Sequence, residues 1–383
     1  MPRDFSRRRP WRGAARSGFG ALLRFLNSIE RLPAPIFTAL LFFVGVISMR
    51  DWILGMGYWL FFLMDWLLLA LLPRFEKSFG PPKPATLILA ILRAPFAALP
   101  LPIILLAQTF GTLLVLYAFW IEPHRLGITR ETLTTPKFRA PAPPLRVLHL
   151  GDLHIERITA RERALIQRVK QLNPDLILFS GDFLNLSYVH DPLARAHARE
   201  ILAQLSAPLG VFVVSGTYPV DQPEILEIIL AGLPIRWLRD ERVTLKHYGN
   251  AIELIGLACT HQPHLDRVAL AAARNGSAGN LTILLYHAPD LAPEAALQNV
   301  DLQLSGHTHG GQVRLPFFGA LFAGSLYGKK FEMGRYAIGA LTLYVTRGIG
   351  MEGAGMPRAR FLCPPEIVLW EIAGEAKIKN IGH

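Results

Sequence analysis

The chain has 383 residues, of which 51% are hydrophobic, and a formal net charge of +11. This hydrophobic fraction is too high for one ordinary soluble domain, and the excess lies between residues 35 and 121. Residues 1–31 hold eight arginines and two acidic residues, a net charge of +6, so the other 352 residues carry only +5. Basic residues before an apolar region are typical of a membrane topology signal, whereas a nucleic-acid-binding protein would carry them on a folded domain. We therefore expect a membrane protein with no nucleic-acid partner.

The first third of the chain predicts a membrane region. Residues 1–33 read as a basic cytoplasmic segment and residues 34–122 as an all-α transmembrane region of about four spans. The apolar stretches behind this prediction are residues 35–49, 52–72, 85–99 and 101–121. A span needs about 20 residues, so the first and third stretches are marginal, and a re-entrant or interfacial position is the alternative for each.

Charge sets the expected topology. The arginine-rich start predicts a cytoplasmic amino terminus, and four spans would return the rest of the chain to the cytoplasm. Three spans would export it. We favour four, which predicts an integral protein of the inner (cytoplasmic) membrane. Asp65 and Arg93 lie inside apolar stretches, where a charge is costly unless paired. We expect them to form an ion pair, with a path for lipid headgroups as the alternative.

After a linker at 123–144, residues 145–375 alternate between strand-like and helix-like segments, and residues 376–383 form a tail. Expected strands are 146–150, 175–180, 211–215, 242–248, 251–255, 281–286, 301–305, 341–345 and 366–372. Expected helices are 159–172, 191–205, 223–231, 264–274 and 291–298, and Asp191-Pro192 opens the second as an N-cap and first residue. This pattern predicts an α/β fold of two mixed β-sheets packed face to face with flanking helices. The two cysteines have no CxxC or CxxH partner, which excludes a zinc finger or a disulfide framework.

Six carboxylate and imidazole side chains follow strand-like runs and read as one metal site. They are Asp152, His154, Asp182, His287, His307 and His309. Ligands of α/β proteins bind at the carboxyl edge of the sheet, where the end of a strand places such groups. Oxygen and imidazole nitrogen suit a divalent transition ion such as Mn, Fe or Zn better than Ca. Two such ions about 3.5–4 Å apart can clamp a phosphoester, and Asp182, between two ligand sets in the sequence, is the natural bridge.

The motifs resemble those of the calcineurin-like metallophosphoesterase family over about residues 145–373. The resemblance rests on Asp152-x-His154, Gly181-Asp182-x-x-Asn185, His287 and Gly306-His307-x-His309. The closing Arg358-x-Arg360 is similar to a bacterial membrane-associated branch of that family. The resemblance implies a four-layer sandwich and a hydrolase with two divalent ions, with Mn favoured over Fe or Zn.

The resemblance also implies roles for single residues. Asp152, His154 and His309 would hold the first ion, His287 and His307 the second, and Asp182 would bridge them. Asp182, His309 and Tyr218 would take part in catalysis. Thr217 would help to bind substrate, and Asn185 would do so too and position the loop after the bridging residue. Arg358 and Arg360 would bind a phosphate, or else form surface ion pairs.

One block departs from the family pattern. Where the family has Gly-Asn-His, this chain has Gly216-Thr217-Tyr218. A Thr hydroxyl is a poorer metal ligand than an amide, and Tyr218 can donate a hydrogen bond but moves protons slowly at neutral pH. Three interpretations remain open: a weak but sufficient second site, a ligand supplied by Asp221 or another group, or a single-metal protein with little activity.

The sequence thus predicts a membrane-anchored phosphohydrolase that cleaves a phosphodiester or pyrophosphate of a lipid-linked substrate such as UDP-2,3-diacylglucosamine. The alternative is a weak or inactive relative that binds a phosphorylated ligand or partner. The bilayer is an expected partner, and the oligomeric state is left open. His261 and His264 could enter the mouth of the site or lie on the surface, and the apolar residues around Phe317-Phe318 could contact lipid.

Overall fold

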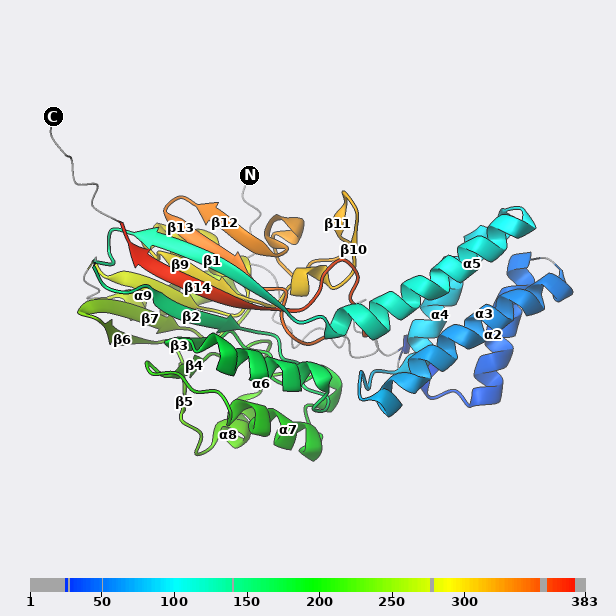
Figure 1. Ribbon diagram of the computed structural model, residues 1–383, viewed down its shortest axis with the longest axis horizontal. Helices are drawn as coiled ribbons and strands as arrows, with labels where there is room; N and C mark the ends of the chain where they lie inside the picture. The colour runs from blue at the N-terminus through cyan, green and yellow to red at the C-terminus, as the bar shows by residue number, and fades with distance from the viewer. Residues whose placement is uncertain are drawn as a thin grey trace.

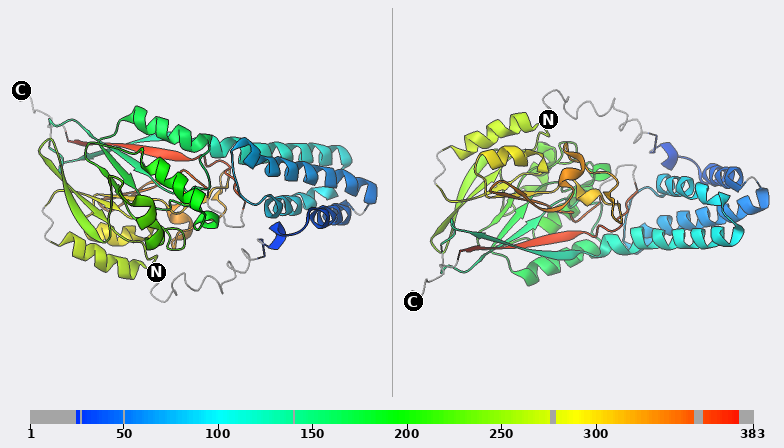
Figure 2. Two further views of the ribbon diagram at one scale, coloured as in Figure 1. Left: turned by 90° about the horizontal axis from the view of Figure 1, so that it is seen from below. Right: turned by 90° about the horizontal axis from the view of Figure 1, so that it is seen from above.

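The computed structural model describes residues 25–375 except 27, 50, 140, 276–278 and 352–356. Most of the predicted basic segment and the predicted tail at 376–383 lie outside the described residues. A helical region at the start of the chain projects from one end of a β-sandwich, as Figures 1 and 2 both show.

The first sheet has six strands in the order β1-β14-β2-β3-β4-β5. Strands β2, β3, β4 and β5 are parallel, and β14 is antiparallel to β2 and parallel to β1. The strands are β1 Gly127–Thr135, β2 Leu145–Leu150, β3 Leu176–Phe179, β4 Val211–Val213, β5 Ile235–Trp237 and β14 Glu366–Gly374.

The second sheet also has six strands, in the order β12-β13-β9-β8-β7-β6. Its four central strands are parallel, and an antiparallel strand closes each edge. The strands are β6 Glu241–His247, β7 Asn250–Gly256, β8 Leu281–Leu285, β9 Leu302–Ser305, β12 Gly334–Ile338 and β13 Leu341–Val345. A separate short hairpin joins β10 Arg314–Leu315 and β11 Gly319–Ala320.

Three apolar cores hold four layers together. The middle core packs the two sheets face to face and includes Trp370 and Leu304, while the outer cores pack helices on the sheets. The first sheet is covered by α6 Ala160–Leu172, α7 Pro192–Leu202 and α8 Pro223–Leu230, and the second by α9 Pro263–Arg274 and α10 Ala292–Leu297. The predicted fold of two mixed sheets with flanking helices is confirmed.

Local sequence sets where several of these helices begin. Thr159 and Glu162 form a capping box at the start of α6, which satisfies backbone N–H groups that no helical carbonyl can reach. Asp191 caps α7, and Pro192 is its first residue, as the sequence predicts. Strand β1 was not predicted. It lies within the predicted linker, and β14 pairs with all nine of its residues, so long-range pairing orders this segment.

The helical region contains four main helices, α2 Ala34–Met49, α3 Trp52–Leu71, α4 Pro82–Arg93 and α5 Leu101–Val115. Of the described residues, two helical segments, Trp52–Phe75 and Leu101–His124, are long and apolar enough to cross a membrane. The four-span arrangement therefore stays a prediction. The expected ion pair is present, with Arg93 Nη2 2.8 Å from Asp65 Oδ2, and both side chains are buried between the helices.

The link between α3 and α4 lies against the sandwich. The carboxylate of Glu156 accepts a hydrogen bond from the Phe79 backbone N–H at 2.8 Å, and the Tyr188 hydroxyl donates to the Phe79 carbonyl at 2.7 Å. Behind α5, the Ala118 carbonyl accepts the Arg360 N–H at 2.9 Å. The link and the end of α5 are thus on the side of the helical region that faces the sandwich.

Candidate metal centre

The site forms where strands of both sheets end toward the helical region. In Figure 1, β14 runs away from the helical region, and β2 is antiparallel to it, so β2 ends at the near side. Five of the six predicted ligands have a left-handed backbone with φ between 44° and 73°, which is uncommon outside glycine. These five are Asp152, His154, Asp182, His307 and His309. Strained backbone of this kind gathers at functional sites, because the surrounding structure must hold it.

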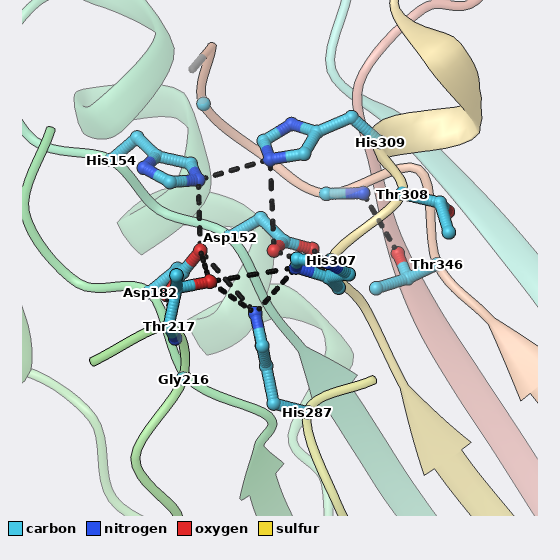
Figure 3. Close-up of polar contacts among 12 residues, drawn as sticks. Asp152, His154, Asp182, Gly216, Thr217, His287, His307, Thr308, His309 and Thr346 are labelled. Atoms are coloured by element: carbon cyan, nitrogen blue, oxygen red, sulfur yellow. Dashed lines mark hydrogen bonds and ion pairs between the residues drawn. The ribbon is translucent and has the colours of Figure 1, made fainter. Parts of the chain in front are cut away.

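The first group of ligands is the triad Asp152, His154 and His309 (the first triad), with ligand atoms within 4.8 Å of one another. The Nε2 atoms of the two histidines are 3.0 Å apart, and His309 Nε2 is 3.7 Å from Asp152 Oδ1. All three residues are buried. Figure 3 shows the two imidazoles converging above the carboxylates.

The second group is the triad Asp182, His287 and His307 (the second triad), which meets the same distance limit. His287 Nε2 is 3.3 Å from Asp182 Oδ2 and 3.2 Å from His307 Nδ1. The same Asp182 oxygen is 3.5 Å from His154 Nε2 of the first triad. Asp182 therefore lies between the triads, where the sequence places a bridging carboxylate (Figure 3).

Hydrogen bonds outside the triads orient two of the imidazoles. His287 Nδ1 is 2.8 Å from the Ser180 carbonyl, and His154 Nδ1 is 3.3 Å from the Leu184 carbonyl. A carbonyl oxygen can only accept a hydrogen bond, so the ring nitrogen that contacts it must carry the proton. In each neutral ring the proton is therefore on Nδ1, and the Nε2 lone pair faces its triad. Lone pairs and carboxylates that converge in a buried space are a donor set for divalent cations, so the residues present fit two metal ions.

Charge within the site separates its carboxyl groups. Burial raises the pKa of Asp152 to about 6. Burial also opposes ionisation of Asp182, but the neighbouring histidines when protonated, His287 foremost, together outweigh it and lower the pKa of this carboxyl below its usual range. Asp182 therefore ionises more readily than Asp152.

The block that departs from the family pattern contacts the second triad directly. The Thr217 N–H donates to Asp182 Oδ1 at 2.6 Å, and its hydroxyl is 3.2 Å from Asp182 Oδ2 and 3.2 Å from His287 Nε2. A side chain at Gly216 would lie 2.2 Å from Asp182 Oδ1, so glycine is required there. The Thr217 hydroxyl therefore lies beside the second triad, and its part in binding a metal or substrate stays a prediction.

Asp221, a candidate from the sequence for an additional metal ligand, supports the backbone of the site. Its carboxylate accepts the backbone N–H groups of Asp182 at 2.6 Å, Phe183 at 3.0 Å and Gly216 at 2.8 Å. Burial raises its pKa to about 7, and the charge of Asp182 adds to this effect. Asp221 thus fixes the two loops that carry Asp182 and Thr217, a role that the sequence did not reveal.

The remaining predicted residues lie around this centre. Asn185 positions its loop as expected: its amide donates to the Met351 carbonyl at 2.8 Å, and its Oδ1 accepts the Ser187 N–H at 2.9 Å. Tyr218 is about half exposed beside Thr217. Its expected part in catalysis stays a prediction.

The two arginines are buried rather than on the surface. Arg358 forms an ion pair with Glu156 at 2.8 Å and donates to Asn185 Oδ1 at 3.2 Å. Arg360 donates to the backbone carbonyls of four residues, which are Arg347, Gly348, Gly350 and Cys363. These contacts give both side chains a structural role. The predicted contact of the two arginines with phosphate is not supported by them and stays a prediction.

His261 lies at the mouth of the site. Its ring centroid is 4.6 Å from that of His307 and 6.1 Å from that of His287. Its Nε2 is buried and has no hydrogen-bond partner among the described residues. The alternative of a surface histidine is therefore wrong. Only a weak signal in the sequence pointed to this residue, because His261 follows a strand-like run outside any motif.

Residues 145–311 match the model of the calcineurin-like phosphoesterase family. Among curated proteins, the uncharacterized metallophosphoesterase YkuE of Bacillus subtilis is 28% identical over 67% of this chain and 88% of its own length. The phosphodiesterase YaeI of Escherichia coli is 28% identical over 67% of this chain and 92% of its own. The UDP-2,3-diacylglucosamine pyrophosphatase LpxG of Chlamydia trachomatis is 27% identical over 66% of this chain and 91% of its own.

Proposed function

This chain carries a calcineurin-like phosphoesterase domain, and from that premise we propose that it is a membrane-anchored, metal-dependent phosphohydrolase. Its substrate is a lipid-linked phosphodiester or pyrophosphate. The observation that carries the proposal is the pair of triads on either side of Asp182, with Nε2 lone pairs of His154 and His287 directed inward.

Two divalent cations fit this donor set, with Mn favoured by the mixture of oxygen and imidazole ligands. We assign the first to Asp152, His154 and His309 and the second to His287 and His307, with Asp182 shared. When bound, such a pair supplies positive charge that polarises a phosphoryl group and lowers the pKa of a water.

The chain's own groups hold this arrangement. Asp221 fixes the Asp182 loop through three backbone N–H groups, and the Thr217 hydroxyl closes the second triad. Backbone carbonyls keep the imidazoles of His154 and His287 in one orientation, so these two rings require little reorganisation when a substrate binds.

A lipid-linked substrate is supported by two observations. LpxG, similar over 66% of this chain and 91% of its own length, is named for its action on UDP-2,3-diacylglucosamine. The site also lies at the end of the sandwich from which two apolar, span-length helices extend. A catalytic centre beside a bilayer meets a substrate whose acyl chains stay in the membrane.

The same geometry supports the expected cytoplasmic orientation. The basic link between α3 and α4 contacts the sandwich through Phe79, so the link and the catalytic domain share one side of the membrane. Arg74, Lys77 and Lys83 lie in or beside this link. Positive residues mark the cytoplasmic side of membrane proteins, which supports a cytoplasmic position of the domain.

The test is turnover by the full chain purified in detergent with Mn²⁺. We expect hydrolysis of bis-p-nitrophenyl phosphate and of UDP-2,3-diacylglucosamine, with about two ions per chain by elemental analysis. Asp182→Ala should lower both rates by more than about 100-fold, since losing a shared ligand should cost more than an outer-shell change. Glu200→Ala, an exposed carboxylate on α7, is the matched control.

A second candidate function is favoured by Thr217 and Tyr218, which replace an amide and an imidazole of the family pattern. It is a metal-containing protein that binds a phosphorylated ligand without turnover. Two bound ions with no hydrolysis of either substrate would establish this function and reject the first. Hydrolysis of bis-p-nitrophenyl phosphate alone would keep the phosphohydrolase and reject the proposed lipid.

A further inference from the structure

The short hairpin at β10 and β11 carries an exposed apolar surface that the catalytic site does not use. Its residues, here called the hairpin patch, are Leu315, Phe317, Phe318, Leu321 and Phe322. Phe317 is fully exposed and Phe322 is 71% exposed. Soluble surfaces seldom gather so many large apolar side chains in so few residues, and those that do usually contact a membrane or another protein.

The base of the hairpin continues the apolar surface of the helical region. Val313 packs on the cluster that joins α3 and the end of α5 to the sandwich, which includes Leu69, Leu72, Val115 and Phe119. Next to it, the Phe361 ring is 5.9 Å from the Tyr117 ring, and the Phe361 carbonyl accepts the Arg314 N–H at 2.9 Å. Figure 1 shows β10 and β11 beside the sandwich end of α5. The hairpin patch therefore lies at the level where the span-length helix meets the domain.

Positive charge flanks the hairpin patch. The Lys329 ammonium is 3.6 Å from the centre of the Phe318 ring and donates to the Phe318 carbonyl, and Lys330 beside it is also exposed. Aromatic side chains with adjacent lysines are the composition of surfaces that insert into the boundary between lipid headgroups and acyl chains. Anionic headgroups attract such lysines.

The chain that leaves the hairpin passes against the catalytic centre. A side chain at Gly324 would lie 3.4 Å from His307 Nε2 of the second triad. Only Ala323 separates Gly324 from Phe322 of the hairpin patch. A lipid held by the hairpin patch would thus have its headgroup near the metal centre.

We propose that the hairpin patch inserts into the same bilayer leaflet that the sandwich end of α5 enters, forming a second membrane contact next to the site. The inference rests on the proposed membrane embedding of α3 and α5. The hairpin patch would be a membrane contact separate from the helices, and it would give a lipid-linked phosphate a route to the second triad.

The experiment places an environment-sensitive nitrobenzoxadiazole probe on single introduced cysteines of the full chain in nanodiscs. The bilayer contains anionic lipid and nitroxide-labelled lipid as a quencher. Phe317→Cys and Phe322→Cys report on the hairpin patch, Phe110→Cys on the exposed side of α5, and Leu297→Cys on α10. The native cysteines, Cys259 and Cys363, are both buried, and the unmodified chain measures their background labelling.

We expect blue-shifted emission and quenching at positions 110, 317 and 322 and neither at 297. Quenching at 110 without quenching at 317 and 322 overturns the hairpin inference and leaves the embedded helices intact. A blue shift at 317 and 322 without quenching overturns it too, because it shows that protein covers the hairpin patch. If position 110 is not quenched, the membrane embedding itself is wrong.

Discussion

The two triads use similar ligands but are completed in different ways. The first triad consists of one carboxylate and two imidazoles, and all three are buried. In the second, Asp182 Oδ2 is also 3.5 Å from His154 Nε2 of the first, the Thr217 hydroxyl is 3.2 Å from His287 Nε2, and His307 is partly exposed. The comparison teaches that a motif with two residues replaced, Thr217 and Tyr218, can still bring a polar side chain to the same place beside the triad, with a hydroxyl that is a poorer metal ligand than an amide. We therefore expect the second ion to bind less tightly than the first.

The largest effect of the three substitutions below is expected from the support beneath Asp182 and Thr217. Asp221→Ala removes the acceptor of three buried backbone N–H groups. Activity should fall about 10- to 100-fold, the range for outer-shell groups at metal sites. The free energy of unfolding should fall by about 1–3 kcal/mol for the groups left without partners. The second ion should be lost at a higher free-metal concentration than the first.

Urea denaturation and a metal titration followed by elemental analysis measure these effects. Glu224→Ala is the control, because this carboxylate is three residues away, exposed in the first turn of α8. If Asp221→Ala keeps full activity and stability, the loops that carry Asp182 and Thr217 do not depend on this carboxylate.

An intermediate effect is expected at Thr217 itself. Thr217→Asn puts an amide oxygen where the hydroxyl lies, and the dissociation constant of the second ion should fall about tenfold, with a higher rate of phosphodiester hydrolysis. Thr217→Ser keeps the hydroxyl and should change little, whereas Thr217→Val removes it and should weaken the site. Unchanged occupancy in a metal titration of Thr217→Asn would mean that the second triad is already complete.

The fold and the triads could be predicted because their signals are local. Apolar runs that alternate with helical segments gave most strands, and each predicted ligand directly follows such a run. Strand β1 was missed because its order depends on pairing with β14, more than 200 residues later. The sequence also could not show that Arg360 is buried among backbone carbonyls, since an Arg-x-Arg pair gives no sign of burial.

Asp221 and His261 show the same limit within the site. Asp221 accepts hydrogen bonds from backbone N–H groups, and no residue type in the sequence indicates such contacts. His261 reaches the site from the loop after β7, and only the packing of the second sheet brings that loop beside His307. Both residues support or border the second triad, where the motif is incomplete and the sequence alone left three interpretations open.

The smallest effect is expected at His261, and it tests whether this imidazole adds to the second triad. Its Nε2 is buried and unpartnered within the described part of the chain, next to two ligand rings, so an N–H there could donate to a phosphate oxygen. One such hydrogen bond contributes about 0.5–1.5 kcal/mol, so His261→Ala should weaken inhibition by inorganic phosphate by about 2- to 12-fold. The metal content should not change, because His261 lies outside both triads. His264→Ala, on α9, is the control. A fall in metal content would instead make His261 a ligand of the second ion, and an unchanged inhibition constant would exclude a contact with phosphate.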